Sequence, residues 1–469
     1  MEAVRRLDAS REPQFLAQPS LNSGMSYALH VWLPDALRMP REHEQEKEMD
    51  TYRELKVEFP KELESMKQAV HRFAKEVVRP AAVQLDRLTD PRDVIALDSP
   101  LRKVFKQAYQ LGYHVAGVPT AIGGMGLRGL GMHVLIEELS WGAVDVALSL
   151  LCASFPFAAA AASGNPELYE KFTKPFIADR DGSFIGCWAI TEPQHGSDQL
   201  APGTPQFHNP RVSGQVVARA HGDSYVISGQ KAAWVSNGTL ATHAALYLTI
   251  EPRAGMAGGG IAFVPLNQPG VSKGKPLDKL GQRALNQGEI FFDEVKIPRG
   301  WMLTAADGYE RELARTLTFA NTAMAAAFTG LARAAYEEAL DYSRQRVQGG
   351  RPICEHQLVQ KHLFEMFTKV EASRALSRAA MIYNQTSATP SLEHAIAAKT
   401  FCTEAAFQVA SDALQIFGGN GLSKEYGIEK LFRDARASLI EDGTTDVLSL
   451  TGVRHILSQN GVTQSAVAI

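Results

Sequence analysis

Cysteine is scarce in this sequence of 469 residues, and its placement limits the chemistry that the chain can support. The 4 cysteines, Cys152, Cys187, Cys354 and Cys402, are far apart and form neither a CxxC pair nor any other metal-ligand spacing. This pattern excludes a disulfide framework and a cysteine-ligated zinc site. We therefore expect reduced, mostly buried thiols, no bound metal, and a protein of the cell interior.

The sequence also lacks a large excess of charge and a long apolar run. Its 48 basic and 51 acidic residues give a formal net charge of −3, so charge provides no general attraction to nucleic acid or to an anionic membrane. No apolar run approaches the roughly 20 residues of a membrane-spanning helix. Acidic residues among the first 40 argue against a transit peptide. We expect no nucleic-acid binding, no membrane span, and a cytoplasmic location in preference to the mitochondrial matrix.

What the sequence does contain is a change of periodicity along the chain. Apolar residues three or four apart predict a helix from residue 60 to a stop at Pro80, and residues 130–163, rich in alanine, leucine and serine, are predicted to be largely buried helix. Short β-rich runs between glycines, prolines and asparagines follow, and long alanine-rich helices are predicted over 310–345, 355–385 and 391–417. We predict an α+β protein with an extension over 1–54, a helical domain over 55–182, a β domain over 183–302 and a helical domain over 303–460. Residues 201–215 are predicted to be an irregular surface insertion.

Two motifs follow one another near the C-terminus. The segment Gln415-Ile-Phe-Gly-Gly-Asn-Gly421 ends an apolar helix in a glycine cluster, where bare backbone N–H groups can approach a phosphate closely. The segment Glu441-Asp442-Gly443-Thr444 places two carboxylates just before another helix, whose unpaired N–H groups favour a negative charge. Each motif alone is equally typical of an ordinary helix end or cap.

Two further motifs lie in the β region. The first is Trp188-Ala-Ile-Thr-Glu-Pro-Gln-His-Gly-Ser-Asp198, in which we interpret His195 as an exposed turn residue. The second is Ile227-Ser-Gly-Gln-Lys-Ala-Ala-Trp-Val-Ser-Asn-Gly238. In the second motif an aromatic residue, Trp234, stands two residues before a hydroxyl residue, Ser236.

In this order the four motifs resemble those of the acyl-CoA dehydrogenase family, over the whole of residues 55–460. The resemblance implies FAD as cofactor and a three-domain fold: an N-terminal helical domain, a middle β-barrel or sandwich domain and a C-terminal four-helix bundle. It assigns FAD and substrate contacts to Thr191, Ser197, Trp234, Ser236 and Thr444. One extra residue between Lys231 and Trp234, relative to the family, predicts a bulge.

The resemblance also implies that the FAD site is shared between subunits. Arg346 corresponds to the arginine that reaches the flavin pyrophosphate of a neighbouring subunit, and Gln415, Gly418 and Gly419 complete that site. A homodimer or homotetramer is therefore expected. Where the family has phenylalanine next to this arginine motif, the chain has Gly349. Residues 279–283, Lys-Leu-Gly-Gln-Arg, match another family landmark that we interpret as structural.

The most informative departure from the family is Asp442, which occupies the position of the usual catalytic glutamate. A carboxylate in an apolar pocket is basic enough to take the α-proton of a thioester, and the resemblance assigns this role to Asp442. Glu441 would need a shifted register to replace it. Some relatives carry the glutamate on the helix that contains Phe319-Ala320-Asn321, but no acid stands at these positions.

The resemblance thus predicts FAD-dependent α,β-dehydrogenation of an acyl-CoA or carrier-bound acyl thioester, in fatty acid metabolism, with an electron-transfer flavoprotein or O2 as acceptor. Three alternatives stay open. Aspartate at this position also resembles nitroalkane oxidase, which favours an oxygen-using flavin oxidase or monooxygenase. A catalytically inactive paralogue is the second. The third is a DNA-associated alkylation-response protein. It would need a basic face or a basic C-terminal extension to bind DNA, and residues 458–469, which contain no lysine or arginine, argue against it.

Overall fold

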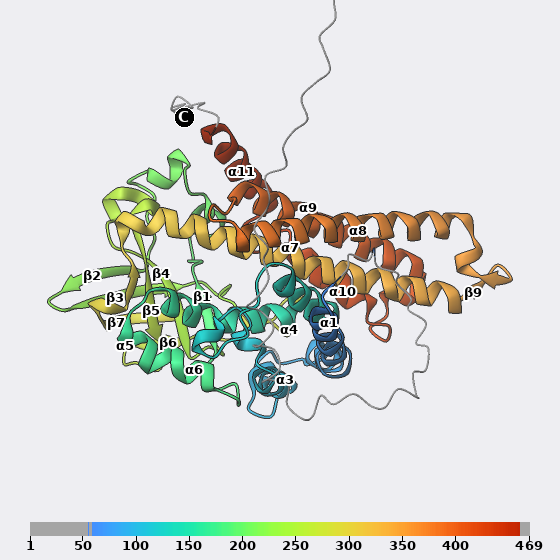
Figure 1. The fold of residues 1–469 in the computed structure, drawn as a ribbon, viewed down its shortest axis with the longest axis horizontal. Coiled ribbons are helices and arrows are strands. Elements are labelled where there is room, and N and C mark those ends of the chain that lie inside the picture. Colours follow the sequence, from blue (N-terminus) through green and yellow to red (C-terminus); the bar gives the residue numbers. More distant parts are fainter. Residues whose placement is uncertain (1–54, 56–58, 460–469) are drawn as a thin grey trace, which may run out of the picture. The chain divides into compact units, whose positions relative to one another are not determined.

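The computed structural model describes residue 55 and residues 59–459 of the chain (Figure 1). The extension predicted over residues 1–54 lies outside this part. The described chain forms helices first, then a sheet of eight strands, then a second set of helices. The predicted α+β class and the order of its parts are confirmed, while the limits chosen for the domains stay predictions.

The first helical part continues through Pro80, so the predicted stop at this residue is wrong. Helix α1 (Lys61–Phe73) passes into a π-helical segment, Ala74–Val78, and then into α2 (Arg79–Asp86). Pro80 closely follows this π-helical segment, at whose end the Arg79 N–H donates to the Ala74 carbonyl oxygen five residues back. The irregular turn accommodates a residue that has no N–H to donate. The remaining helices of this part are α3 (Pro100–Gln110), α4 (Leu130–Ala162), α5 (Pro166–Leu168) and α6 (Lys174–Ala178).

Helix α4 is long and apolar enough, by length and composition alone, to cross a membrane, which inspection of the sequence missed. In the fold, 67% of its most apolar window is buried inside the protein. It packs against α7, α1 and the first strand of the sheet. Backbone angles at Ala143 are extended (φ −167°, ψ 120°) and interrupt the helix. We therefore assign α4 to the core of the fold.

The sheet has the strand order β6-β7-β3-β2-β4-β5-β8, with β1 pairing parallel to β4. The β-rich runs predicted from the sequence, over 184–190, 225–228, 244–250, 261–264 and 289–297, correspond to five strands. These are β1 (Gly186–Ala189), β3 (Ser224–Lys231), β4 (His243–Thr249), β5 (Gly259–Pro265) and β7 (Ile290–Pro298). Three short strands were missed: β2 (Val217–His221), β6 (Val271–Lys273) and β8 (Met302–Thr304). The predicted bulge before Trp234 is instead a turn that follows β3, because β3 ends at Lys231.

The C-terminal part contains the three long helices expected, α7 (Ala306–Gln345), α8 (Gln357–Thr386) and α9 (Leu392–Phe417), which run side by side in Figure 1. Shorter helices α10 (Ile428–Ala437) and α11 (Thr445–Gln459) follow. Between α7 and α8, strands β9 (Val347–Gln348) and β10 (Arg351–Pro352) form a hairpin. Its two turn residues, Gly349 (φ +64°) and Gly350 (φ +84°), are left-handed, so this turn favours glycine where the family has phenylalanine.

The insertion over residues 201–215 is anchored in the core rather than lying only on the surface. Phe207 is 1% exposed and belongs to an apolar cluster that includes Leu313 of α7 and Leu448 of α11. The backbone N–H of Gly203 donates to Glu310 Oε1 at 2.6 Å. The expectation of a surface loop is therefore wrong for Phe207, because a single aromatic residue in a polar stretch gives no periodic signal.

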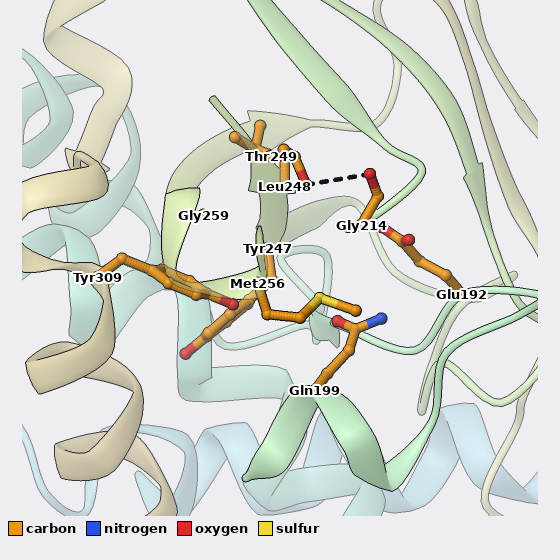
Figure 2. Close-up of a pocket in the computed structure, with 9 residues that line it drawn as sticks. All are labelled: Glu192, Gln199, Gly214, Tyr247, Leu248, Thr249, Met256, Gly259 and Tyr309. Atoms are coloured by element: carbon orange, nitrogen blue, oxygen red, sulfur yellow. Dashed lines mark hydrogen bonds between the residues drawn. The ribbon is translucent and has the colours of Figure 1, made fainter. Parts of the chain in front are cut away.

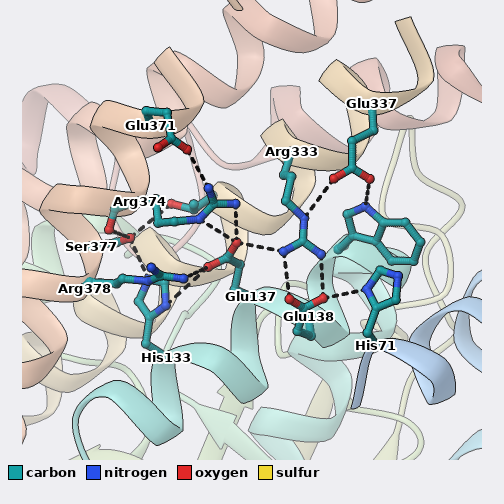
Figure 3. A network of polar contacts seen from close by, with 12 residues as sticks. His71, His133, Glu137, Glu138, Arg333, Glu337, Glu371, Arg374, Ser377 and Arg378 are labelled. Carbon is teal, nitrogen blue, oxygen red and sulfur yellow. Dashed lines mark hydrogen bonds and ion pairs between the residues drawn. The ribbon is translucent and has the colours of Figure 1, made fainter. Parts of the chain in front are cut away.

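A network of buried charges ties α4 to α7 and α8 (Figure 3). Arg333 donates from Nη1 to Glu137 Oε1 at 3.0 Å and from Nη2 to Glu138 Oε2 at 2.5 Å. Arg374 donates from Nη2 to the same Glu137 oxygen at 2.8 Å, and His71 of α1 contacts Glu138 at 2.8 Å. Burial opposes ionisation of Glu138, yet the charge of Arg333 and its hydrogen bond lower the pKa of this carboxyl to about 2. Ion pairing thus compensates these buried charges.

Removing one member of this network should destabilise the fold strongly. We expect Arg333→Met to lower the free energy of unfolding by about 3–5 kcal/mol, because Glu138 would remain buried without its main partner. The matched control is Arg92→Met, since Arg92 pairs with Asp90 on the surface, and a change within about 0.5 kcal/mol is expected there. Denaturant titration of both variants measures the difference. Equal effects would contradict the role of the network.

Candidate active site

The carboxyl pair Glu441 and Asp442 lies in the short loop between α10 and α11. Asp442 adopts a left-handed backbone conformation (φ +52°), as does Gly443 (φ +98°). Left-handed backbone is unfavourable for a residue with a side chain, by about 1–2 kcal/mol. Such a conformation persists only when the surrounding structure holds it, so the contacts of this loop decide where Asp442 points.

Three contacts from different parts of the fold hold the loop, which we name the base loop (residues 441–444). Gln282 donates from Nε2 to Glu441 Oε1 at 2.6 Å. Lys399 of α9 donates from Nζ to the Gly443 carbonyl oxygen at 2.8 Å. The backbone N–H of Thr444 donates to Ser197 Oγ at 3.0 Å. The base loop is therefore anchored to the sheet part and to α9 at the same time.

Both carboxyls of the base loop have raised pKa values. Burial raises the pKa of Asp442 to about 6, against the opposing charge of Lys399. Burial and the neighbouring charge of Asp442 raise the pKa of Glu441 to about 7, although Gln282 and two lysines oppose the shift. The Asp442 carboxylate accepts no hydrogen bond from another side chain within residues 59–459, whereas the Glu441 carboxylate accepts one from Gln282. Asp442 is thus the carboxylate available to another molecule.

On the sheet side, Trp234 and Ser236 are held by one glutamine. Gln287 donates from Nε2 to the Trp234 carbonyl oxygen at 3.3 Å and to Ser236 Oγ at 3.4 Å. Lys279 donates to Gln287 Oε1 at 2.8 Å, and its positive charge also interacts with Glu441. Burial, and then the negative charge of Asp442, raise the pKa of the Cys152 thiol, while a hydrogen bond with Ser236 opposes the shift. The Cys152 thiol therefore interacts both with Ser236, through a hydrogen bond, and with the charges of the carboxyl pair.

The motif around Thr191 has a structural component as well. Thr191 accepts a hydrogen bond from the Ala232 N–H through its carbonyl oxygen at 2.9 Å. The adjacent Glu192 forms a buried ion pair with Lys231, with Nζ and Oε1 2.7 Å apart. Glu192 also lines a small cavity with Gln199 and other residues (Figure 2). Its volume of about 10 Å³ is close to the minimum for one water molecule, so it is not a substrate pocket.

The remaining predicted residues lie together at a second place, near the C-terminal end of α9. Arg346, Gln415, Gly418 and Gly419 are all exposed there. Tyr342 joins their two segments, since its ring stacks on Phe417 with centroids 4.0 Å apart. Lys399 and Gln415 stand about 24 Å apart along α9 at 1.5 Å per residue. The structure thus brings Ser197, Ser236, Asp442 and Thr444 together and leaves the second group apart from them.

The residues in both places fit FAD. Trp234 is 59% exposed, which leaves a flat aromatic face open to a ring system. At Gly418 and Gly419 no atom would lie within 4 Å of an added Cβ, so a ligand can approach the bare backbone closely. Arg346 offers a guanidinium for phosphate. Because the two groups lie far apart along α9, each fits a different portion of an extended cofactor.

Four polar residues of the site were not assigned to it from the sequence. Lys279 and Gln282 belong to the segment interpreted as structural, and Gln287 follows it. Lys399 stands within the apolar run Ala395-Ile-Ala-Ala-Lys-Thr-Phe-Cys402. A lysine in such a run is a signal, because a buried ammonium needs a partner. Its partner, the Gly443 carbonyl, becomes visible only in the structure.

Comparison with known proteins finds family models that match most of the described chain. Models of the acyl-CoA dehydrogenase N-terminal, middle and C-terminal domains match residues 60–180, 187–295 and 307–457. The chain is 30% identical over 403 residues to the mitochondrial short-chain specific acyl-CoA dehydrogenase of Bos taurus, covering 86% of this chain and 91% of the relative. It is 31% identical over 340 residues to cyclohex-1-ene-1-carbonyl-CoA dehydrogenase of Geobacter metallireducens, covering 72% and 86%.

Solved structures show the same fold. Butyryl-CoA dehydrogenase from Megasphaera elsdenii superposes with a TM-score of 0.74 at 26% identity, covering 86% of this chain and all of that one. The prolyl acyl carrier protein oxidase AnaB superposes with a TM-score of 0.75 at 22% identity, covering 85% of this chain. The second likeness shows the fold alone.

The glycine pair at the end of α9 provides a test of the cofactor assignment. Gly418 has a left-handed backbone (φ +59°), so Gly418→Ala should lower the free energy of unfolding of flavin-free protein by about 1–2 kcal/mol. Gly419→Ala should change it by less than about 0.5 kcal/mol, because Gly419 has no left-handed strain and open space around it. Both variants should bind FAD more weakly. Unchanged FAD affinity in Gly419→Ala, measured by fluorescence titration, would contradict a cofactor contact there.

Proposed function

Since this chain belongs to the acyl-CoA dehydrogenase family of FAD-dependent oxidoreductases, we propose that it catalyses α,β-dehydrogenation of an acyl-CoA or carrier-bound acyl thioester. The observation that supports this most strongly is the partly exposed Asp442 carboxylate, which is free of hydrogen bonds to other residues in the described part of the chain and is held by the three anchors of the base loop. A desolvated carboxylate with a raised pKa is the group that α-proton removal requires.

In the proposed reaction Asp442 takes the proton from the carbon next to the thioester carbonyl. Its pKa of about 6 leaves it ionised at neutral pH, yet more basic than an exposed aspartate. Glu441 is assigned a supporting role, because its carboxylate is turned to Gln282 at 2.6 Å. FAD, when bound, supplies the acceptor for the β-hydride. The 3.0 Å hydrogen bond between Thr444 and Ser197 holds the base loop against the segment that follows strand β1.

A homo-oligomer follows from the separation of the two groups of cofactor residues. Residues at the far end of α9 would bind the FAD whose ring lies beside Trp234 of another subunit. Exposed apolar side chains on α8, α9 and α11 provide a surface for association, among them Phe364, Phe401 and Leu450. We propose a dimer or tetramer in which each FAD site uses two chains.

An electron-transfer flavoprotein is the proposed electron acceptor, as the family suggests. The competing function is an oxygen-using oxidase, with a nitroalkane in place of a thioester. One observation favours it: aspartate replaces the usual glutamate at position 442, as the family resemblance to nitroalkane oxidase implies. The two functions share the base and differ in substrate and acceptor, so one set of reduction experiments separates them.

The base is tested by anaerobic mixing with a panel of acyl-CoAs while the absorbance of oxidised FAD is followed. The rate of bleaching should rise with pH as Asp442 loses its proton near pH 6 and should level off above. Asp442→Asn should reduce this rate about 10²–10⁴-fold. The matched control Glu441→Gln retains an acceptor for Gln282 and should lower it less than about tenfold.

Other outcomes of this experiment separate the alternatives. Bleaching by a nitroalkane and not by any thioester, followed by rapid reoxidation in air, would favour the oxidase. Unchanged rates in Asp442→Asn would show that another group removes the proton. A protein that binds FAD and reacts with neither substrate would favour an inactive paralogue.

Sharing of the site between chains is tested by mixing two inactive variants. Asp442→Asn lacks the base, and Arg346→Ala lacks the arginine assigned to the flavin pyrophosphate. The two variants are mixed in equal amounts, unfolded and refolded. If they form dimers, about half of these contain one chain of each variant, and each such dimer has one intact site of two, so about a quarter of wild-type activity should return. Sites formed within single chains would regain none.

A further inference from the structure

Lys399 is a fully buried lysine whose ammonium lies beside the base loop. It stands on α9 with 0% exposure and donates to the Gly443 carbonyl oxygen at 2.8 Å. This is its one hydrogen bond from Nζ among residues 59–459. An ammonium can donate three hydrogen bonds, so Lys399 has donors left beyond this one bond.

The charges around Lys399 come from several elements. Asp442 and Glu441 of the base loop, and then the exposed Glu404 of α9 itself, interact favourably with its ammonium. From the loop after β6, Lys279 interacts with Glu441, and Cys152 of α4 is a half-buried thiol whose electrostatics Asp442 affects. Burial lowers the pKa of Lys399, and the two carboxylates oppose this shift. Asp442 interacts appreciably with Lys399 and with no other lysine or arginine among the described residues.

Burying a lysine is unfavourable by several kcal/mol unless the charge has a partner. A neutral side chain of similar length would fill the same space in α9 without that cost. Lys399 contacts the residue directly after Asp442, in the part of the loop where two consecutive residues are left-handed. Its position therefore bears on both the direction and the ionisation of the base.

We propose that Lys399 is the positioning residue of the base: its hydrogen bond to Gly443 holds the left-handed loop, and its charge keeps Asp442 ionised. The inference rests on the proposed function of Asp442 and adds a second residue to it. The hydrogen bond and the charge make separable contributions, since different substitutions remove one or both. Lys399 touches neither substrate nor cofactor in this scheme.

Three substitutions separate the two contributions. Lys399→Gln retains a hydrogen-bond donor and removes the charge. Lys399→Met has a similar volume and removes both, and Lys399→Arg retains both. Lys279→Met is the control, because Lys279 is a half-buried lysine of the same site whose charge acts on Glu441. Each variant is studied as the full chain with bound FAD, and thermal unfolding shows whether it is folded.

The ionisation of Asp442 is measured directly by infrared titration of protein labelled with ¹³C at the aspartate carboxyls, with Asp442→Asn identifying the band. We expect the Asp442 pKa to rise by at least about one unit in Lys399→Gln and Lys399→Met, because a positive neighbour lowers a carboxyl pKa by about 1–3 units. Lys399→Arg and Lys279→Met should leave it within about half a unit of wild type.

The kinetic expectation separates charge from position. In Lys399→Gln the acid limb of acyl-CoA-dependent FAD bleaching should move to higher pH with little loss of the plateau rate. In Lys399→Met the plateau should also fall by about 10–100-fold, because the base is no longer held in place. Loss of thermal stability without a change in the Asp442 titration in either variant would overturn the proposal.

Failure of the proposed function would appear differently. If Asp442→Asn retains full bleaching by acyl-CoA, Asp442 is not the base, whatever Lys399 does to its titration. If Asp442→Asn is inactive and the Asp442 pKa is the same in Lys399→Gln and wild type, Asp442 is supported as the base and the proposed role of Lys399 is wrong. Should Lys399→Met not fold, Lys399→Gln alone gives the titration.

Discussion

The hydrogen bond between Lys399 and the Gly443 carbonyl is the interaction on which the geometry of the site depends. Asp442 would not adopt a left-handed conformation in a free loop, and α9 supplies a fixed point against which the loop is held. Gln282 and Ser197 hold Glu441 and Thr444, the residues on either side of the left-handed pair. A carboxylate with raised basicity and a defined direction is the result.

The same constraint, that a buried charge needs a partner, organises the rest of the fold. Lys231 pairs with Glu192 beneath the Thr191 motif, and Lys430 pairs with Asp145 at 2.9 Å between α10 and α4. Arg333 joins α4 to α7 in the same way. These pairs fix helices and sheet relative to one another inside the described part of the chain. The carboxyl pair differs, because Asp442 has no hydrogen-bonded side-chain partner of its own among residues 59–459.

Helix α9 connects the two halves of the cofactor assignment. Its first turns carry Lys399, which faces the base loop, and its last turns carry the exposed Gln415 and the glycine pair. A rigid helix of this length places the two groups at opposite ends of one element. The proposed oligomer follows from this spacing, since one chain offers two separate parts of a site that an extended cofactor would join.

The amino-acid sequence was sufficient to predict the α+β class, the three long C-terminal helices, the principal strands and the motifs that identify the family. These features follow from periodicity and from local patterns, which depend on residues close together in the sequence. Only the packed structure shows that the helix running from α1 into α2 continues through Pro80, that Phe207 is buried, and that short strands such as β6 pair with a neighbour. Their stability comes from distant neighbours. The anchors of the base loop belong to the same class, because Gln282, Lys399 and Ser197 meet Asp442 only when segments far apart in sequence are packed together.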